Sequence, residues 1–289
     1  MNQNQKKEIQ LLTAQYVGKS KSQAQAAASL KNVSEATLIN IKNNKWDSIS
    51  DEMWRNVGKQ VGWNDRRSNM VETRNLSTLL YYYGLAKEYG ETFAITGPEG
   101  SGKSYAGKWY AQTMRGQNVW YLECHALLNK KYFLHELLEA MGKSAAGLNA
   151  YEMMKLIVME LRKQDKPLII LDEVDKLDDK VLQFFITLYN QLHGLCGIVW
   201  TSTDAISVRI KRRMDKKTIG FGEIFSRIGR RFIELPGLNK QEMRAICEAN
   251  DMTEEEDINR FWNESEGDIR RVDRGSIQVA EKKKRKNAA

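Results

Sequence analysis

The segment GPEGSGKS at residues 97–104 constrains the fold of this chain more than any other part of the sequence. It follows the apolar run FAIT, residues 93–96, and leads into a helical pattern. In such a loop, glycines let backbone N–H groups turn inward around phosphate groups, and the positive end of the following helix adds to the attraction. A strand, a glycine-rich loop and a helix in this order predict a phosphate-binding loop in an α/β fold.

The side chains of this loop have distinct predicted roles. We expect Lys103 to reach the β and γ phosphates of a nucleotide, and the Ser104 hydroxyl to coordinate Mg²⁺. A glycine-rich turn beside a surface lysine is the alternative, which the strand before the loop and the helix after it disfavour. The predicted nucleotide-binding residues here are Gly97, Pro98, Glu99, Gly100, Ser101, Gly102, Lys103, Ser104 and Tyr105.

A second apolar run, residues 168–171, ends in the carboxylates Asp172 and Glu173. Because ligands collect at the carboxyl ends of parallel strands, we expect both side chains beside the loop. Asp172 would hold Mg²⁺ through its water shell, and Glu173 would orient and deprotonate the attacking water. An apolar run ending in Asp-Glu is common by itself, so this interpretation depends on Lys103 about 70 residues upstream.

The sequence has two parts with different hydrophobic patterns. From residue 92, short apolar runs alternate with helical patterns, which predicts a parallel sheet covered by helices on both faces. The predicted strands are residues 93–96, 119–123, 168–171, 198–202 and 231–235. Residues 6–64 read instead as short helices, with Ser34 and Ser50 as N-caps. The predicted helices are residues 6–16, 23–30, 35–42 and 51–61, followed by one at 76–89.

Composition narrows the cellular setting. The apolar runs are far shorter than the roughly 20 residues of a membrane-spanning helix, so we expect no membrane partner. The first ten residues lack the apolar stretch of a secretory signal, and we expect a cytoplasmic protein. Cys124, Cys196 and Cys247 lie far apart, without metal-ligand spacing, and are expected to be reduced packing residues.

The net charge of +8 is unevenly distributed. Residues 1–75 carry +5, the tail at 282–286 carries another +5, and the segment between them carries −2. Basic extensions on a near-neutral body are typical of proteins with a polyanionic partner, and DNA or RNA is the leading candidate. A solvated tail that only keeps the chain soluble is the alternative.

Residues 22–46 have the pattern of a helix-turn-helix. Small residues at 24 and 26–28 would let the first helix approach the second, and Ser34 would cap the second after a turn at 31–33. The predicted groove-facing residues are Ser34, Glu35, Thr37, Asn40, Lys42, Asn43 and Lys45. A helical packing module that never touches nucleic acid is the alternative.

Two further basic stretches are candidate DNA contacts. One follows the second predicted strand, and the other, residues 209–217, follows the fourth. Phosphate contacts there would be indifferent to base sequence, although such stretches are commonly only solvated. The predicted contacts are Lys130, Lys131, Arg209, Lys211, Arg212 and Arg213.

These motifs together resemble the AAA+ ATPases, and within them the phage Mu B family of transposition ATPases. The likeness rests on the helical N-terminal module, the phosphate loop, and the segments DEVD, GIVWTSTD, IFSRIGRR and EGDIRR. It implies ATP and Mg²⁺ as cofactors, a parallel-sheet P-loop core, and a small C-terminal helical lid. The implied domains are a helix-turn-helix module at 1–64, a linker at 65–75, the core at 76–236, the lid at 237–281 and a basic tail at 282–289.

The resemblance also implies roles for single residues. Thr203 lies where the family places the polar side chain that senses the γ-phosphate. Other members often carry Asn there, which leaves Thr201 and Ser202 as alternatives. Arg227 resembles the arginine finger that reaches a neighbouring subunit's nucleotide, with Arg230 and Arg231 as rivals, and Arg270 is similar to the lid's sensor arginine. Each arginine has a simpler alternative role at a helix C-terminus.

By this resemblance we expect an ATPase that assembles into a ring or helical filament on double-stranded DNA, largely without sequence preference. It would deliver target DNA to a transposase. The alternatives are a helicase loader similar to the DnaC and IstB group, a nucleotide-switched regulator that reads one operator, and an RNA-directed or signalling ATPase of the same fold.

Overall fold

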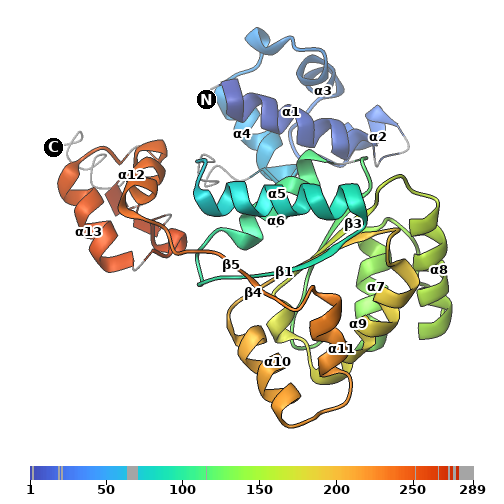
Figure 1. Ribbon diagram of the computed structural model, residues 1–289. Coiled ribbons are helices and arrows are strands. Elements are labelled where there is room, and N and C mark those ends of the chain that lie inside the picture. The colour runs from blue at the N-terminus through green and yellow to red at the C-terminus, as the bar shows by residue number, and fades with distance from the viewer. Residues whose placement is uncertain are drawn as a thin grey trace. The chain divides into compact units, whose positions relative to one another are not determined.

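The computed structural model describes the chain except for residues 2, 19, 21, 64–70, 115, 251, 266, 273, 276–277 and 280–289. The chain divides into two compact units, residues 1–68 and 69–289 (Figure 1). Each unit has its own hydrophobic core. The predicted basic tail at 282–289 and residues 65–70 of the predicted linker lie outside the described residues.

Short helices form the first unit. They are α1 (Gln3–Gly18), α2 (Gln23–Ala28), α3 (Glu35–Lys42), the 3-10 helix η1 (Trp46–Ser48) and α4 (Asp51–Gln60). Both predicted N-caps are confirmed, because the Ser34 and Ser50 hydroxyls accept hydrogen bonds from the backbone N–H groups of Thr37 and Met53, at 3.1 and 3.2 Å. The serines thereby satisfy donors that the first turn of a helix leaves free.

Of the small residues that we expect to let α2 approach α3, at 24 and 26–28, only some are buried. Ala26 and Ala27 are buried, whereas Ala24 and Ala28 are exposed. A helix packs through one face, so Ala26 and Ala27 can contact the neighbouring helices and Ala24 and Ala28 cannot. The remaining core of this unit gathers around the fully buried Trp54.

A five-stranded parallel sheet forms the centre of the second unit (Figure 1). Its strands are β1 (Thr92–Thr96), β2 (Val119–Glu123), β3 (Leu168–Asp172), β4 (Gly197–Ser202) and β5 (Ile233–Glu234). Their order across the sheet is β2-β3-β4-β1-β5. The strand predicted at 231–235 is shortened to two residues, because the turn before it places Arg230 in the left-handed region, with φ at 58°.

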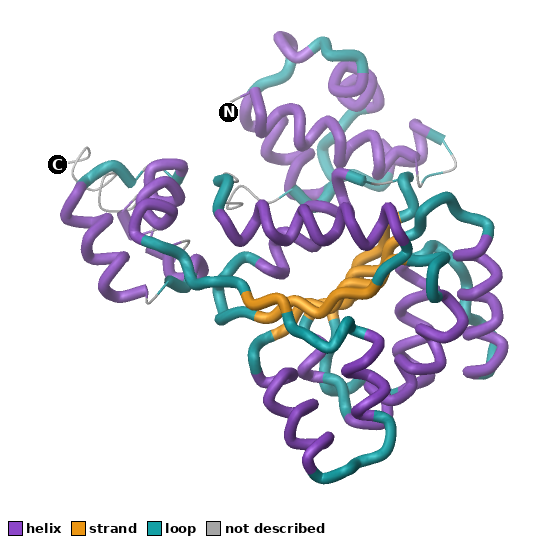
Figure 2. Tube along the Cα trace, viewed as in Figure 1, coloured by secondary structure: helices purple, strands orange, loops and turns teal. Residues whose placement is uncertain are grey.

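Helices cover both faces of this sheet, as the sequence predicts (Figure 2). One face packs against α5 (Arg74–Tyr89) and α6 (Lys103–Thr113). The other packs against α7 (Lys130–Ala140), α8 (Ala150–Arg162), α9 (Asp179–Leu192), α10 (Ala205–Asp215) and α11 (Phe221–Arg227). Alternate residues of each strand point to opposite faces, so that Ile170 joins the first layer and Ile169 the second.

The C-terminal helices α12 (Lys240–Ala249) and α13 (Glu255–Ser265) gather around a separate cluster that includes Met243 and Phe261. The predicted linker ends earlier than expected, because the Thr73 hydroxyl caps α5 and starts that helix at Arg74. Cys124, Cys196 and Cys247 are buried free thiols. Within the described part of the chain, no helix combines the length and apolarity needed to cross a bilayer.

Gly84 on α5 and Gly197 at the start of β4 should respond in opposite ways to substitution by alanine. A Cβ at Gly197 would lie 2.3 Å from the Ala86 carbonyl oxygen, whereas a Cβ at Gly84 would meet no atom within 4 Å. Gly197→Ala should therefore destabilise the fold by about 1–3 kcal/mol through overpacking. Gly84→Ala should stabilise helix α5 by about 0.5–1 kcal/mol. Thermal unfolding of the full chain measures both effects, and equal melting temperatures would contradict this packing.

Candidate active site

The carboxyl ends of β1, β3 and β4 bring the predicted site residues to one edge of the sheet. Thr96 ends β1 and lies in register with Ser202, which ends β4. Asp172 ends β3 on the other side of β4. The phosphate loop starts directly after Thr96, and the Gly97 N–H donates to the Ser202 carbonyl at 3.2 Å. The two motifs that lie far apart in sequence therefore meet at this edge.

Two glycines shape the phosphate loop. Gly100 and Gly102 have φ values of 72° and 90°, in the left-handed region that residues with a Cβ rarely adopt. Gly100 also approaches Asp268 so closely that an added Cβ would lie 2.0 Å from its carboxylate oxygen. Gly102 is the N-cap of α6, which begins at Lys103. The loop therefore leads into a helix N-terminus, which favours anions.

Lys103 is buried inside this loop. Its ammonium donates to the carbonyls of Gly97 and Pro98, both at 2.8 Å, and to the Ser101 hydroxyl at 3.1 Å. Burial lowers the pKa of Lys103, while the nearby Asp172 carboxylate acts in the opposite direction. The ammonium therefore lies where the loop backbone would surround a phosphate.

Asp172 is buried with a hydrogen bond to each carboxylate oxygen. The Tyr121 hydroxyl of β2 donates to Oδ2 at 2.7 Å, and the Thr201 hydroxyl of β4 donates to Oδ1 at 2.5 Å. Buried polar groups need such partners because their desolvation is costly. Strands on both sides of β3 thus fix the orientation of this carboxylate.

Glu173 adopts an unusual backbone conformation. Its φ and ψ are 54° and 40°, in the left-handed region, where it precedes the 3-10 turn η2 (Val174–Lys176). A residue with a Cβ adopts this conformation at a cost of about 1 kcal/mol or more. Burial raises the pKa of Glu173, and the Asp172 carboxylate raises it further. A carboxylate with a raised pKa is a better proton acceptor near neutral pH.

The three candidate sensor residues at the end of β4 have different partners. Thr201 donates to Asp172. The hydroxyls of Ser202 and Thr203 both donate to the Asp175 carboxylate, at 2.7 and 3.1 Å. All three hydroxyls thus donate to carboxylates at or just after the end of β3, and Asp175 is the partner of Thr203.

Arg270 lies at the phosphate loop. Its Nη2 donates to Glu99 Oε2 at 3.0 Å and to Asp268 Oδ2 at 3.1 Å. The Ile269 N–H donates to the Gly100 carbonyl at 3.2 Å, which fastens the segment after α13 to the loop. Arg270 is therefore brought together with the loop, as its predicted role requires.

Arg227 lies far from this edge. Its Nε donates to Asn190 Oδ1 at 3.2 Å, and its guanidinium lies 5.4 Å from the centre of the Tyr189 ring, near the end of α9. Asp179 begins α9 at the site edge, and eleven residues at 1.5 Å each place Asn190 about 16 Å away along the helix. Arg227 therefore does not reach the phosphate loop of its own chain.

The predicted DNA contacts occupy separate surfaces. On and beside α3, Ser34, Lys42 and Lys45 are exposed, while Thr37 and Asn40 are half-buried. Lys130 and Lys131 are exposed in the first turn of α7, and Lys211 and Arg212 are exposed on α10. By contrast, both Arg209 and Arg213 form ion pairs with Asp179. The structure therefore leaves the lysines and Arg212 freer for phosphate than these two arginines.

Three site residues were missed by the sequence reasoning. Tyr121 and Asp175 hold other site side chains, and the Asn75 amide of α5 donates to the Ser101 carbonyl at 3.3 Å. Asp175 belongs to the DEVD segment, so its acidity next to Glu173 was a usable signal. Tyr121 and Asn75 stand in ordinary strand and helix patterns, and nothing in the sequence marks them.

The donor set at the edge fits Mg²⁺. A hydroxyl at Ser104 and a carboxylate at Asp172 are the hard oxygen ligands that this ion prefers. Among the described residues, no cluster of three or more His, Cys, Asp or Glu side chains could hold a metal by itself. Mg²⁺ characteristically keeps several water ligands and binds through one or two carboxylates plus phosphate oxygens. The Ser104 hydroxyl and the Asp172 carboxylate are donors of this kind.

Comparison with known families identifies the fold around this edge. The family model described as "AAA domain" matches residues 87–208, which include the loop, Asp172, Glu173 and Thr203. This segment is therefore similar to an AAA domain. The match leaves out Arg227, Arg270 and the first unit. No curated protein matches the sequence.

Solved structures show the same fold at low sequence identity. AMPPCP-bound DnaA from Aquifex aeolicus has a TM-score of 0.50 and 17% identity, over 78% of this chain and 70% of DnaA. NtrX from Brucella abortus in complex with ATP has a TM-score of 0.50 and 14% identity, over 86% of this chain and 59% of NtrX. This chain therefore spans less than two thirds of NtrX, and both likenesses concern the fold alone.

The raised pKa of Glu173 predicts an acid limb in any nucleotide hydrolysis by this chain. The carboxylate must be ionised to accept a proton, so kcat should fall as pH drops through a pKa above the ordinary 4.5. We expect the acid limb of kcat to correspond to the binding of one proton per site. We expect kcat of the Glu173→Gln variant to be at least about 100-fold lower than that of the wild type. Glu139→Gln, which changes an exposed carboxylate on α7, is the control. An acid limb that persists unchanged in residual Glu173→Gln activity would contradict this role, provided circular dichroism shows folded protein throughout.

Proposed function

We propose that residues 69–289 bind ATP with Mg²⁺ and hydrolyse it. The observation that carries this proposal is the buried Lys103 ammonium in the loop after β1, with Asp172 and Glu173 at the end of β3 on the same edge. A phosphate loop, a fixed carboxylate and a second carboxylate of raised pKa are the parts that phosphoryl transfer to water needs.

Each residue has a definite part in this proposal. Lys103 exchanges the loop carbonyls for β- and γ-phosphate oxygens, and the backbone N–H groups of Gly102, Lys103 and Ser104 donate to the phosphates. Ser104 and Asp172 hold Mg²⁺, which neutralises developing phosphate charge when bound. Glu173 orients water and accepts its proton. Arg270 exchanges Glu99 for a phosphate oxygen. Thr203 exchanges its hydrogen bond to Asp175 for one to the γ-phosphate and so acts as the sensor.

We propose that the active form is a homo-oligomer, a ring or a helical filament with nucleotide between subunits. The position of Arg227 near the end of α9 supports this, because its guanidinium lies away from its own loop and would be available to the nucleotide of a neighbouring copy. A cation supplied by a neighbour stabilises transition-state charge and makes hydrolysis depend on assembly.

We further propose that this assembly binds double-stranded DNA in the cytoplasm, largely without sequence preference, and presents it to a transposase. The capped helix α3 of the first unit and the exposed Lys130, Lys131, Lys211 and Arg212 support DNA binding by charge and shape. The transposase partner rests on the resemblance to the phage Mu B family. A footprint on one defined operator would select the regulator alternative instead, and ATP-dependent binding to a replicative helicase would select a loader.

Two substitutions should separate nucleotide binding from turnover. Lys103→Ala should lose ATP affinity by about 100-fold or more, because a buried cation facing phosphate is removed, and with it ATP-dependent DNA binding. Glu173→Gln should keep ATP affinity and ATP-dependent DNA binding, but the variant should stay bound to DNA for longer than the wild type. Filter binding with and without ATP measures these effects. Lys155→Ala, which removes an exposed lysine of α8, is the matched control. Equal ATP-dependent DNA affinity in wild type and Lys103→Ala would refute the coupling.

Mixing two inactive variants tests the shared site. Arg227→Ala retains Glu173, and Glu173→Gln retains Arg227, so each should be nearly inactive alone. Mixed assemblies contain interfaces with both residues intact, roughly a quarter of them at equal ratio, and should regain a matching fraction of ATPase activity. Arg230→Ala and Arg231→Ala are the controls for Arg227. Failure of the mixture to exceed the sum of its parts would contradict the shared site.

A further inference from the structure

The turn after Glu173 is tied to the end of β4 through Asp175. Both carboxylate oxygens of Asp175 accept hydrogen bonds, from the Ser202 hydroxyl at 2.7 Å and the Thr203 hydroxyl at 3.1 Å. The Asp175 side chain is nearly buried, with 9% exposed. Two hydroxyls on one buried carboxylate fix its position relative to the strand.

The same turn is tied to α10 through Arg209. Its Nη1 donates to the backbone carbonyls of Asp175 and Leu177, at 3.3 and 2.7 Å. Its Nε and Nη2 donate to the Asp179 carboxylate, at 2.9 and 2.5 Å. One planar guanidinium therefore spans the turn and the first residue of α9, a geometry that a lysine could not reproduce.

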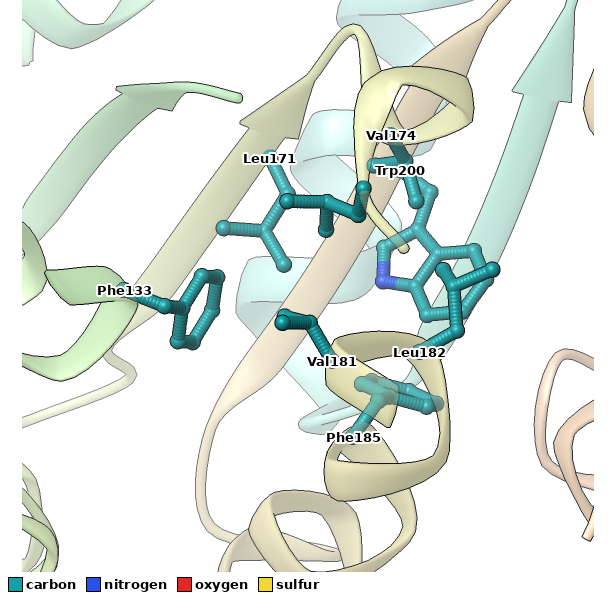
Figure 3. Close-up of a pocket in the computed structure, with 8 residues that line it drawn as sticks. Phe133, Leu171, Val174, Val181, Leu182, Phe185 and Trp200 are labelled. Carbon is teal, nitrogen blue, oxygen red and sulfur yellow. The ribbon is translucent and has the colours of Figure 1, made fainter. Parts of the chain in front are cut away.

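The apolar side chains of this turn face the core. Val174, which is fully buried, lines a small apolar cavity together with Leu171, Trp200 and Phe133 (Figure 3). The polar groups of the turn are bound instead by β4, through the Asp175 carboxylate, and by α10, through backbone carbonyls.

We infer that Asp175 and Arg209 are positioning residues that hold Glu173 in its left-handed conformation, and that Arg209 connects α10 to hydrolysis instead of contacting DNA. The inference rests on the proposed ATPase function. A strained backbone persists only where its surroundings hold it, and these two side chains are the polar contacts that grip the residues after Glu173. DNA bound at the exposed Lys211 and Arg212 would act on the turn through Arg209.

Asp175→Asn tests the first half of this inference. The substitution keeps the shape but loses one acceptor, so Glu173 should be misplaced while the phosphate loop stays intact. We expect kcat to fall about 10- to 100-fold, with the KM and the dissociation constant for ATP changed less than about 2-fold. Ser207→Ala, on α10 near Arg209, is the control that should match wild type. A wild-type kcat for Asp175→Asn would overturn the inference.

Arg209→Gln and Arg209→Lys test the second half. For Arg209→Gln we expect a lower kcat and the loss of stimulation by duplex DNA, with the affinity for DNA and its salt dependence unchanged. Arg209→Lys should recover only part of the rate, because it lacks the planar fork. If Arg209 instead contacted phosphate, Arg209→Gln would weaken DNA binding, lower the salt slope by about 1 and leave basal kcat intact. That result would overturn the inference.

The wild-type chain distinguishes this inference from the proposed function. Without ATP hydrolysis by folded wild-type protein, with duplex DNA and without it, the proposed function and this inference both fail. With an active wild type and unchanged kcat in Asp175→Asn and Arg209→Gln, only the positioning role fails. Thermal unfolding of each variant shows whether a lost rate comes from a lost fold.

Discussion

Parallel pairing of β1, β4 and β3 is the constraint on which the rest of the second unit depends. Parallel strands end at the same edge, so Lys103 after β1, Ser202 on β4 and Asp172 on β3 meet there although they lie far apart in sequence. A one-residue slip of β3 would turn Asp172 to the other face and remove its contacts with Tyr121 and Thr201. The apolar residues that alternate along each strand exclude such a slip.

Charged groups are buried at this edge, and hydrogen-bond partners nearby offset the free-energy cost of their desolvation. Lys103 is surrounded by oxygen acceptors, and each Asp172 oxygen has a hydroxyl donor. Fully satisfied buried networks are rigid, because any displacement leaves a polar group without a partner. Glu173 is different, since its backbone lies in the left-handed region and its carboxylate has a raised pKa. A carboxylate fixed by hydrogen bonds and one on a strained backbone thus lie at adjacent positions of the chain.

Two arginines link this edge to more distant parts of the molecule. Arg270 fastens the C-terminal helices to the loop through Glu99, where a bound phosphate would compete for the guanidinium. Arg227 is held at the opposite end of α9, beyond the reach of its own loop. The edge thus has one arginine close by, while the other lies beyond its reach.

The sequence by itself determined the order of the strands along the chain, the limits of the helix at 35–42, the N-caps Ser34 and Ser50, and the meeting of the loop with Asp172 and Glu173. These features follow from periodicity, from side-chain chemistry within a few residues, and from the direction rule of parallel sheets. Only the tertiary structure decided that Asp175 holds Ser202 and Thr203, that Arg209 binds carbonyls, and that β5 is reduced to two residues. Such contacts join segments tens of residues apart, and their geometry depends on how helices and turns pack, which no local pattern encodes.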